Sequence, residues 1–102
     1  KDVLASGGGD DKIRFWRISD GWMLKVEAVQ GEVASMAFSP DGRLLAIGLW
    51  GGQVQILSVP DGAVLASLEG HASAVSDVVF TSDGKALFTV SYDGTIRAWG
   101  LP

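Results

Sequence analysis

The sequence predicts an all-β fold of short antiparallel strands, and three observations support this prediction. Apolar and polar residues alternate with a period of two in most segments, whereas the spacing of an amphipathic helix is absent. Asp-Gly pairs separate many of these segments, and such pairs indicate hairpins because glycine tolerates the positive φ of a tight turn. The pattern also recurs: Trp16, Leu57 and Trp99 are equivalent, spaced by 41 and 42 residues.

The last third of the chain shows the pattern most clearly. Strands are predicted at 75–80, 86–91 and 95–99, joined by turns at 82–84 and 92–94 that each contain Asp-Gly. The same pattern of strands and turns occurs in two copies earlier in the chain. Together they predict ten strands, at residues 3–7, 12–18, 22–29, 33–38, 44–48, 53–59, 63–68, 75–80, 86–91 and 95–99.

The amino-acid composition limits which kinds of partner and which cellular location are expected. The chain has 102 residues, of which 47% are hydrophobic, enough for a core. Its net charge is −4 and Lys and Arg do not cluster, which argues against a nucleic-acid partner. No apolar run approaches the roughly 20 residues needed to cross a bilayer, so no membrane association is expected. Cysteine is absent, so disulfide and thiolate chemistry are excluded and a cytoplasmic location is expected.

Three short motifs in the last copy connect the repeat to a known family. They are Gly70-His71, the Ser-Tyr-Asp-Gly of 91–94 and the Ile-Arg-Ala-Trp of 96–99. With a period of 40–45 residues, they resemble the WD-repeat β-propeller family. The Asp that usually follows the Trp is Gly100 in the last copy and Arg17 in the first.

The resemblance implies that the strands form four-stranded antiparallel sheets, the blades of a propeller. Residues 1–29 are expected to be a partial blade (strands two to four), 30–69 a complete blade and 70–102 a partial blade (strands one to three), all within one propeller domain. Propeller rings usually hold four to eight blades. The ring is therefore expected to be incomplete, part of a larger propeller whose open strand edges favour the remaining blades or self-association.

The resemblance also implies a structural role for His71, the one histidine of the chain. In the family it belongs to a buried hydrogen-bond tetrad with a strand hydroxyl (Thr89 or Ser91), Asp93 and Trp99. This set looks superficially like a Ser-His-Asp catalytic triad. The structural interpretation is preferred here because the histidine lies where the family keeps a structural one.

The middle copy provides an internal comparison for the tetrad. Its equivalent positions are Ile47 or Leu49, Gly51 and Leu57, so the polar members are replaced together. A buried polar network is expected to be complete or absent, because a half-satisfied one costs more than none. The first copy keeps Ser6, Asp10 and Trp16.

No residue pattern predicts catalysis, a cofactor or a metal. Five aspartates precede glycine in turns, which turn chemistry explains: Asp20, Asp41, Asp61, Asp83 and Asp93. The Asp10-Asp11 pair lacks the spacing of an EF-hand, and the glycines before it lack the phosphate-binding GxxxxGK[ST] pattern.

The resemblance implies that partners bind at one set of turns. These are the turns between second and third strands, together with the connections between blades. The candidate partner-binding residues are Trp50, Tyr92, Glu32 and Ser73. Trp50 precedes two glycines and is a candidate interface anchor, although it could also pack on a neighbouring blade. Tyr92 could be structural or neutral.

The favoured function is a non-catalytic scaffold, a propeller segment that presents a turn-rich face to a protein partner. It could form the sensor or scaffold end of a larger effector protein, as the resemblance implies. One alternative is a self-assembling structural fragment. Another is an enzyme on a propeller scaffold, which is disfavoured because no convergent acid, base or metal ligands are visible.

Overall fold

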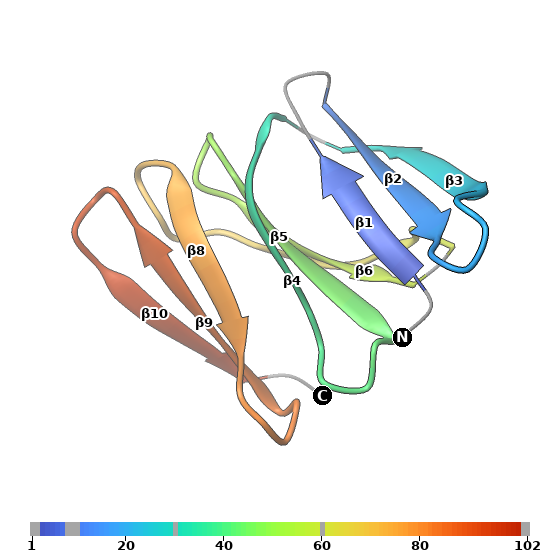
Figure 1. The fold of residues 1–102 in the computed structure, drawn as a ribbon. Helices are drawn as coiled ribbons and strands as arrows, with labels where there is room; N and C mark the ends of the chain where they lie inside the picture. The colour runs from blue at the N-terminus through green and yellow to red at the C-terminus, as the bar shows by residue number, and fades with distance from the viewer. Residues whose placement is uncertain (1–2, 8–10, 30, 60, 101–102) are drawn as a thin grey trace.

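The computed structural model describes residues 3–7, 11–29, 31–59 and 61–100. Within them the chain forms strands only, and the predicted all-β class is confirmed (Figure 1). Across these residues no helix is long and apolar enough to cross a membrane. The strands are β1 (Val3–Gly7), β2 (Lys12–Arg17), β3 (Met23–Ala28), β4 (Val33–Phe38), β5 (Leu44–Leu49), β6 (Val54–Ser58), β7 (Val64–Leu68), β8 (Val75–Phe80), β9 (Ala86–Ser91) and β10 (Ile96–Gly100).

The strands form three antiparallel sheets that follow one another along the chain. The first has the order β1-β2-β3, the second β4-β5-β6-β7 and the third β10-β9-β8. Figure 1 shows them side by side, with the four-stranded sheet between the other two. Each strand pairs with its neighbour in sequence, as expected for hairpins joined by short turns.

Several strand ends differ from the sequence prediction by a residue or two, because turn hydrogen bonds use the terminal amides. The strand predicted at 22–29 begins at Met23, since the Trp22 amide donates to the Asp20 carboxylate at 3.0 Å. The last strand begins at Ile96, because the Thr95 amide donates to Asp93 at 2.9 Å.

The turns at one end of the sheets repeat the same local structure. The Asp41 carboxylate accepts hydrogen bonds from the Ser39 hydroxyl at 2.6 Å and the Arg43 amide at 3.0 Å. The Thr81–Asp83 turn is built in the same way. Each is followed by a glycine at positive φ, 74° at Gly42 and 71° at Gly84. These aspartates therefore stabilise turns, as the sequence predicts.

Irregularities in strand pairing also recur with the sequence period. In the first sheet and again in the second, the pairing of the last two strands contains a register shift. In the second sheet and again in the third, the pairing of the first two strands contains another. They lie at Phe15/Trp16 and Ile56/Leu57, and at Val33/Ser35 and Val75/Asp77. The repeat therefore extends to the bulges, which bend and twist a sheet locally.

Two apolar cores lie between neighbouring sheets. The first joins the first and second sheets, and its buried members are Ile13, Phe15, Leu45, Ile47, Leu49 and Leu57. The second joins the second and third sheets, and its buried members are Ala46, Val54, Ile56, Val75, Val78 and Leu87. The second sheet is thus covered on both faces, which explains why nearly all of β5 and β6 is buried.

A glycine allows the second and third sheets to approach closely. A Cβ placed at Gly48 would lie 2.6 Å from Val75 Cγ1 and 2.5 Å from Ser35 Oγ, closer than real Cβ contacts. Gly7, the equivalent residue of the first sheet, lies similarly against Val33, with a Cβ distance of 3.2 Å. Both sheet interfaces thus pair a glycine of one sheet with the first-strand valine of the next.

Candidate functional site

The connections at the upper edge of Figure 1 bring together the residues that the sequence singles out. We call the described loops of the second and third sheets at this edge, residues 31–32, 50–53, 69–74 and 92–95, the turn face. The Trp50 amide donates to the Glu32 carbonyl at 2.9 Å, and the Tyr92 amide donates to the Ala74 carbonyl at 3.0 Å. Each turn is thus held against the connection that enters its own sheet.

Gly52 joins the turn of the second sheet to the third sheet. Its φ is +96°, and a Cβ there would lie 2.4 Å from the His71 carbonyl oxygen and 3.1 Å from that of Ser73. No residue with a side chain fits this approach without displacing backbone. The turn at 50–53 and the connection at 69–74 therefore form one continuous surface.

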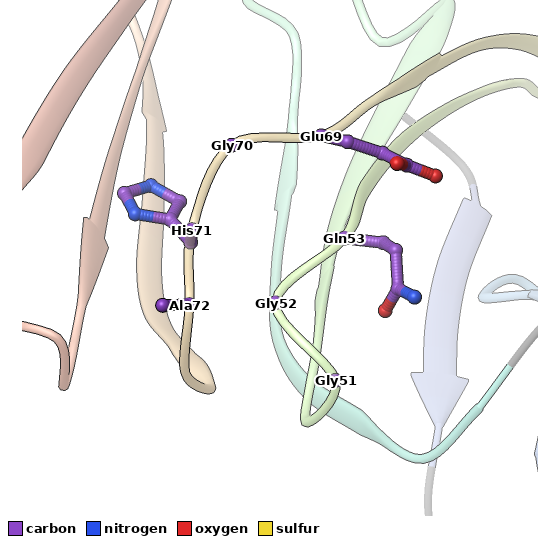
Figure 2. Close-up of a pocket in the computed structure, with 7 residues that line it drawn as sticks. All are labelled: Gly51, Gly52, Gln53, Glu69, Gly70, His71 and Ala72. Carbon is purple, nitrogen blue, oxygen red and sulfur yellow. The ribbon is translucent and has the colours of Figure 1, made fainter.

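A pocket of about 290 Å³ opens between these two segments. Its walls are mostly backbone and small side chains, from Gly51, Gly52, Gln53, Glu69, Gly70, His71 and Ala72. Figure 2 shows that Glu69 and Gln53 extend to the same side of the pocket, whereas the His71 ring points away from both.

The His71 ring lies in a hydrogen-bonded network within the third sheet. Its Nε2 lies 2.7 Å from the Thr89 hydroxyl, which also accepts the Trp99 indole N–H at 2.9 Å. Its Nδ1 lies 3.3 Å from the Asp93 carboxylate and 3.1 Å from the Thr95 hydroxyl. One consistent proton assignment has Nδ1–H donating to Asp93 and the Thr89 hydroxyl donating to Nε2. This uses both ring nitrogens.

Ser91, the other hydroxyl considered from the sequence, makes different contacts. Its Oγ donates to the Ser73 carbonyl at 3.0 Å and accepts the Asp93 amide at 3.1 Å. It therefore ties the strand end to the connection at 69–74, while Thr89, which is fully buried, contacts the imidazole.

The three sheets differ at the network positions in a consistent way. In the first sheet the Trp16 indole donates to the Ser6 hydroxyl at 2.9 Å, as Trp99 does to Thr89. In the second sheet the equivalent residues are Ile47 and Leu57, both apolar and fully buried. Asp10, also expected in the first-copy network, lies outside the described residues.

The carboxylate of Asp93 has more hydrogen-bond donors than a typical surface aspartate. It accepts from the Thr95 hydroxyl, from the Ala72 amide at 2.8 Å and from the Thr95 amide. The Thr95 hydroxyl and then the Ala72 amide hold the pKa of Asp93 well below its ordinary value of 3.8. Asp93 is therefore ionised at neutral pH and fixes the start of the connection at 69–74.

Comparisons with known proteins place this geometry in a family. The family model described as the anaphase-promoting complex subunit 4 WD40 domain matches residues 1–83. The chain belongs to the WD40-repeat family. Its WD40 relatives include the periodic tryptophan protein 2 homolog of Caenorhabditis elegans, which is 32% identical over 104 residues, 98% of this chain. Another is the target of rapamycin complex subunit wat1 of Schizosaccharomyces pombe, 32% identical over 97% of this chain.

The chain spans only part of these WD40 relatives, 11% of the first and 32% of the second. Among solved structures, the computationally designed Ika4 protein superposes with a TM-score of 0.87 at 24% identity, covering all of this chain and 62% of that protein. At this identity the similarity shows the fold alone. The predicted WD-repeat propeller resemblance is confirmed, and the family supports a protein-interaction scaffold.

The candidate partner-binding residues lie together on the turn face of this WD40 chain. Trp50 is 52% exposed and Tyr92 is 70% exposed. Glu32 is exposed, and Ser73 is half-buried with its carbonyl bound by Ser91. Trp50 therefore projects from the surface instead of packing fully against a neighbouring sheet.

Sequence reasoning missed three residues that shape this edge of the WD40 fold. Thr95 contacts both Asp93 and His71, and the Asp-Gly-Thr spacing of its turn could have indicated it. Gln53 and Glu69 line the pocket, but no local signal in the sequence identifies them. Their importance comes from the meeting of two repeats, which the sequence of either repeat does not show.

The lowered pKa values of the turn aspartates predict that the stability of the fold decreases at acidic pH. The pKa values of Asp20, Asp41 and Asp83 are lowered like that of Asp93, first by the side chains of Arg17, Ser39 and Thr81 and then by backbone amides. A carboxyl with a lowered folded-state pKa stabilises the fold above its ordinary value of 3.8, and this contribution is lost as the pH falls toward the folded-state pKa.

We therefore expect the urea midpoint of unfolding to be steady near neutrality and to fall as the pH drops below about 4. The measurement is a series of urea titrations followed by tryptophan fluorescence. Asp93→Asn should lower the midpoint at neutral pH and flatten the acid-dependent part of the curve. A midpoint that does not change below the ordinary carboxyl pKa would contradict the role given to these hydrogen bonds.

Proposed function

We propose that this chain is a non-catalytic protein-interaction scaffold whose turn face contacts the partner, with Trp50 and Tyr92 as anchors. The observation that carries the proposal is the exposure of two large aromatic side chains on turns whose backbone is hydrogen-bonded to the neighbouring connections. Aromatic residues of this kind dominate binding energy in many interfaces. They lose little conformational entropy when the turn is already ordered.

The absence of a catalytic role is part of the proposal and rests on His71. Its ring is buried, 8% exposed, and both nitrogens contact Thr89, Asp93 or Thr95. A general base must reach a substrate proton, which this ring does not. Among the described residues no three His, Cys, Asp or Glu side chains group as metal ligands, and no cofactor is proposed. A cytoplasmic location, without nucleic-acid or membrane partners, stays a prediction.

The test is affinity purification of partners by wild-type protein, by Trp50→Ala and by a matched variant, Trp22→Ala. Trp22 is 66% exposed but precedes β3, at the opposite end of the sheets. We expect Trp50→Ala to lose partners that Trp22→Ala retains, with at least about a thirtyfold weaker Kd for a purified partner, the scale of a hot-spot residue.

Equal thermal midpoints for the two variants would separate binding from folding. If Trp50→Ala and Trp22→Ala retain the same partners with the same affinity, the turn face is not the binding surface. If Trp50→Ala unfolds while Trp22→Ala does not, Trp50 acts as a packing residue and its role as an anchor is wrong.

A second candidate function, association with further propeller blades or with another copy of the chain, is favoured by the outer face of the third sheet. Phe88 and Ile96 are 43% and 70% exposed there, whereas their equivalents in the second sheet, Ala46 and Val54, are fully buried. Val79 adds to this face at 50% exposure. Such a contiguous apolar face commonly marks an interaction surface.

Light scattering after size-exclusion chromatography tests this second candidate. Association through the face predicts a mass above that of one chain, and Ile96→Lys should return it to the monomer mass. A monomer that does not respond to the substitution would rule out self-association through this face. A role as the sensor or scaffold end of a larger effector protein is also a proposal, in keeping with the small share of its relatives that the chain spans.

A further inference from the structure

The described loops of the turn face, at the second and third sheets, carry acidic residues. The charged residues of these loops are Glu32, Glu69 and Asp93. The basic groups near them are the Arg97 guanidinium of β10, which lies against Gly70, and Lys12, at the same edge of the first sheet. The turns at the opposite end carry both signs, because Arg43 and Lys85 follow their Asp-Gly pairs. An excess of exposed carboxylates attracts a basic partner segment and disfavours an acidic one.

Two of these carboxylates are available to a partner. Asp93 is occupied by hydrogen bonds from Ala72 and Thr95. Glu32 and Glu69 are exposed, and neither carboxylate has a hydrogen bond or ion pair with another residue of the described ranges. Of the two, Glu69 lines the pocket.

The pocket is small and carries polar groups. Its volume of about 290 Å³ is at the lower limit of the usual range for small-molecule sites, roughly 300–1,000 Å³, and leaves room for a single side chain. Gln53, an uncharged amide, extends to the same side as the Glu69 carboxylate (Figure 2). One carboxylate and one amide oxygen are too few to hold Ca²⁺, which takes six to eight oxygen ligands, but they suit an ammonium or guanidinium group.

The Arg97 side chain lies near the pocket but does not pair with Glu69. The Arg97 guanidinium packs against Gly70, where a Cβ would lie 3.1 Å from its Cζ. No ion pair within 4.0 Å joins it to Glu69 among the described residues. Arg97 belongs to β10 of the third sheet, whereas Glu69 extends toward the opposite side of the pocket from His71 (Figure 2).

We propose that the pocket between residues 51–53 and 69–72 receives an arginine or lysine side chain of the partner protein, with Glu69 as its counter-charge and Gln53 as a second acceptor. The proposal rests on the proposed function, because it assigns the partner chemistry at the same turn face. Trp50, which precedes Gly51 in the chain, is exposed on the same turn.

The experiment uses a phage library of short random peptides, selected in parallel on wild-type protein, Glu69→Gln and Glu27→Gln. Glu27 provides the matched control, since it lies on β3, and its replacement removes the same charge. We expect arginine or lysine to be enriched at one position of the peptides selected on wild type and Glu27→Gln, and not on Glu69→Gln. For the best synthetic peptide, Glu69→Gln should weaken the Kd about tenfold, about 1.4 kcal/mol, at low salt.

A double-mutant cycle then locates the contact. Replacing the basic peptide residue with alanine should cost about as much as Glu69→Gln, and the two changes together should cost little more than either. Additive losses would overturn the proposal. Equal thermal midpoints of wild type and Glu69→Gln would show that folding is unchanged, as expected for an exposed glutamate.

The remaining outcomes separate this proposal from the proposed function. If the selected peptides lack basic residues but lose binding to Trp50→Ala, the turn face binds partners and the assigned chemistry is wrong. If no selected peptide depends on Trp50 or Glu69, both proposals fail.

Discussion

Replacing Trp99 with alanine is expected to destabilise the protein by about 3 kcal/mol, the scale of a large-to-small substitution in a packed core. The indole packs against the core between the second and third sheets. It also donates its N–H to the buried Thr89 hydroxyl at 2.9 Å, so the substitution removes both apolar contacts and a hydrogen bond. Urea unfolding followed by circular dichroism measures the effect.

Trp22→Ala is the matched control, because Trp22 is 66% exposed. It should change stability by less than about 0.5 kcal/mol. Thr89→Val separates the polar part of the effect, since it leaves the indole N–H and His71 Nε2 without their partner and should cost about 1–3 kcal/mol. If Trp99→Ala and Trp22→Ala unfold at the same urea concentration, the network around His71 does not stabilise the third sheet.

Replacing Gly48 with alanine is expected to cost about 2 kcal/mol, the scale of overpacking in a close-packed interior. The new Cβ would lie 2.7 Å from Val75 Cβ and 2.6 Å from its Cγ1, so the second and third sheets must move apart. We expect a lower thermal midpoint and a matching loss in urea unfolding.

Gly31→Ala provides the control for this substitution, since nothing lies within 4 Å of a Cβ at that position. Val75→Ala in the Gly48→Ala background removes the contacting Cγ1 and should recover part of the loss, so the two substitutions will not be additive. Equal stabilities of Gly48→Ala and Gly31→Ala would show that the sheets are not packed as closely as described.

Both predictions concern the packing of one sheet against the next, and that packing also forms the turn face. Gly48 sets how closely β8 approaches β5, and Gly52 sets how closely the connection at 69–74 approaches the turn at 50–53. The pocket and the exposed Trp50 depend on both approaches. A substitution that separates the sheets, such as Gly48→Ala, should therefore weaken partner binding at the turn face even though the substituted residue lies outside that face.

Local patterns in the sequence were enough to predict the strands, the turns and the repeat. Alternating apolar residues and Asp-Gly pairs act through local geometry, so strands such as β4, β8 and β9 coincide with their predicted ranges. The repeat also indicated the family and the equivalence of Trp16, Leu57 and Trp99. The residues of the His71 network were identified through the family resemblance, with the hydroxyl left open between Thr89 and Ser91.

Contacts between side chains of different strands or repeats were not predictable in this way, because they depend on how the strands and sheets pack in space. The structure places Thr89 against the His71 ring, whereas Ser91, at the end of β9, is bound to the Ser73 carbonyl. The pocket joins Gln53 of one repeat to Glu69, at the entry to the next. Such contacts depend on the distance between packed sheets. The pattern of residues along one repeat contains no information about that distance.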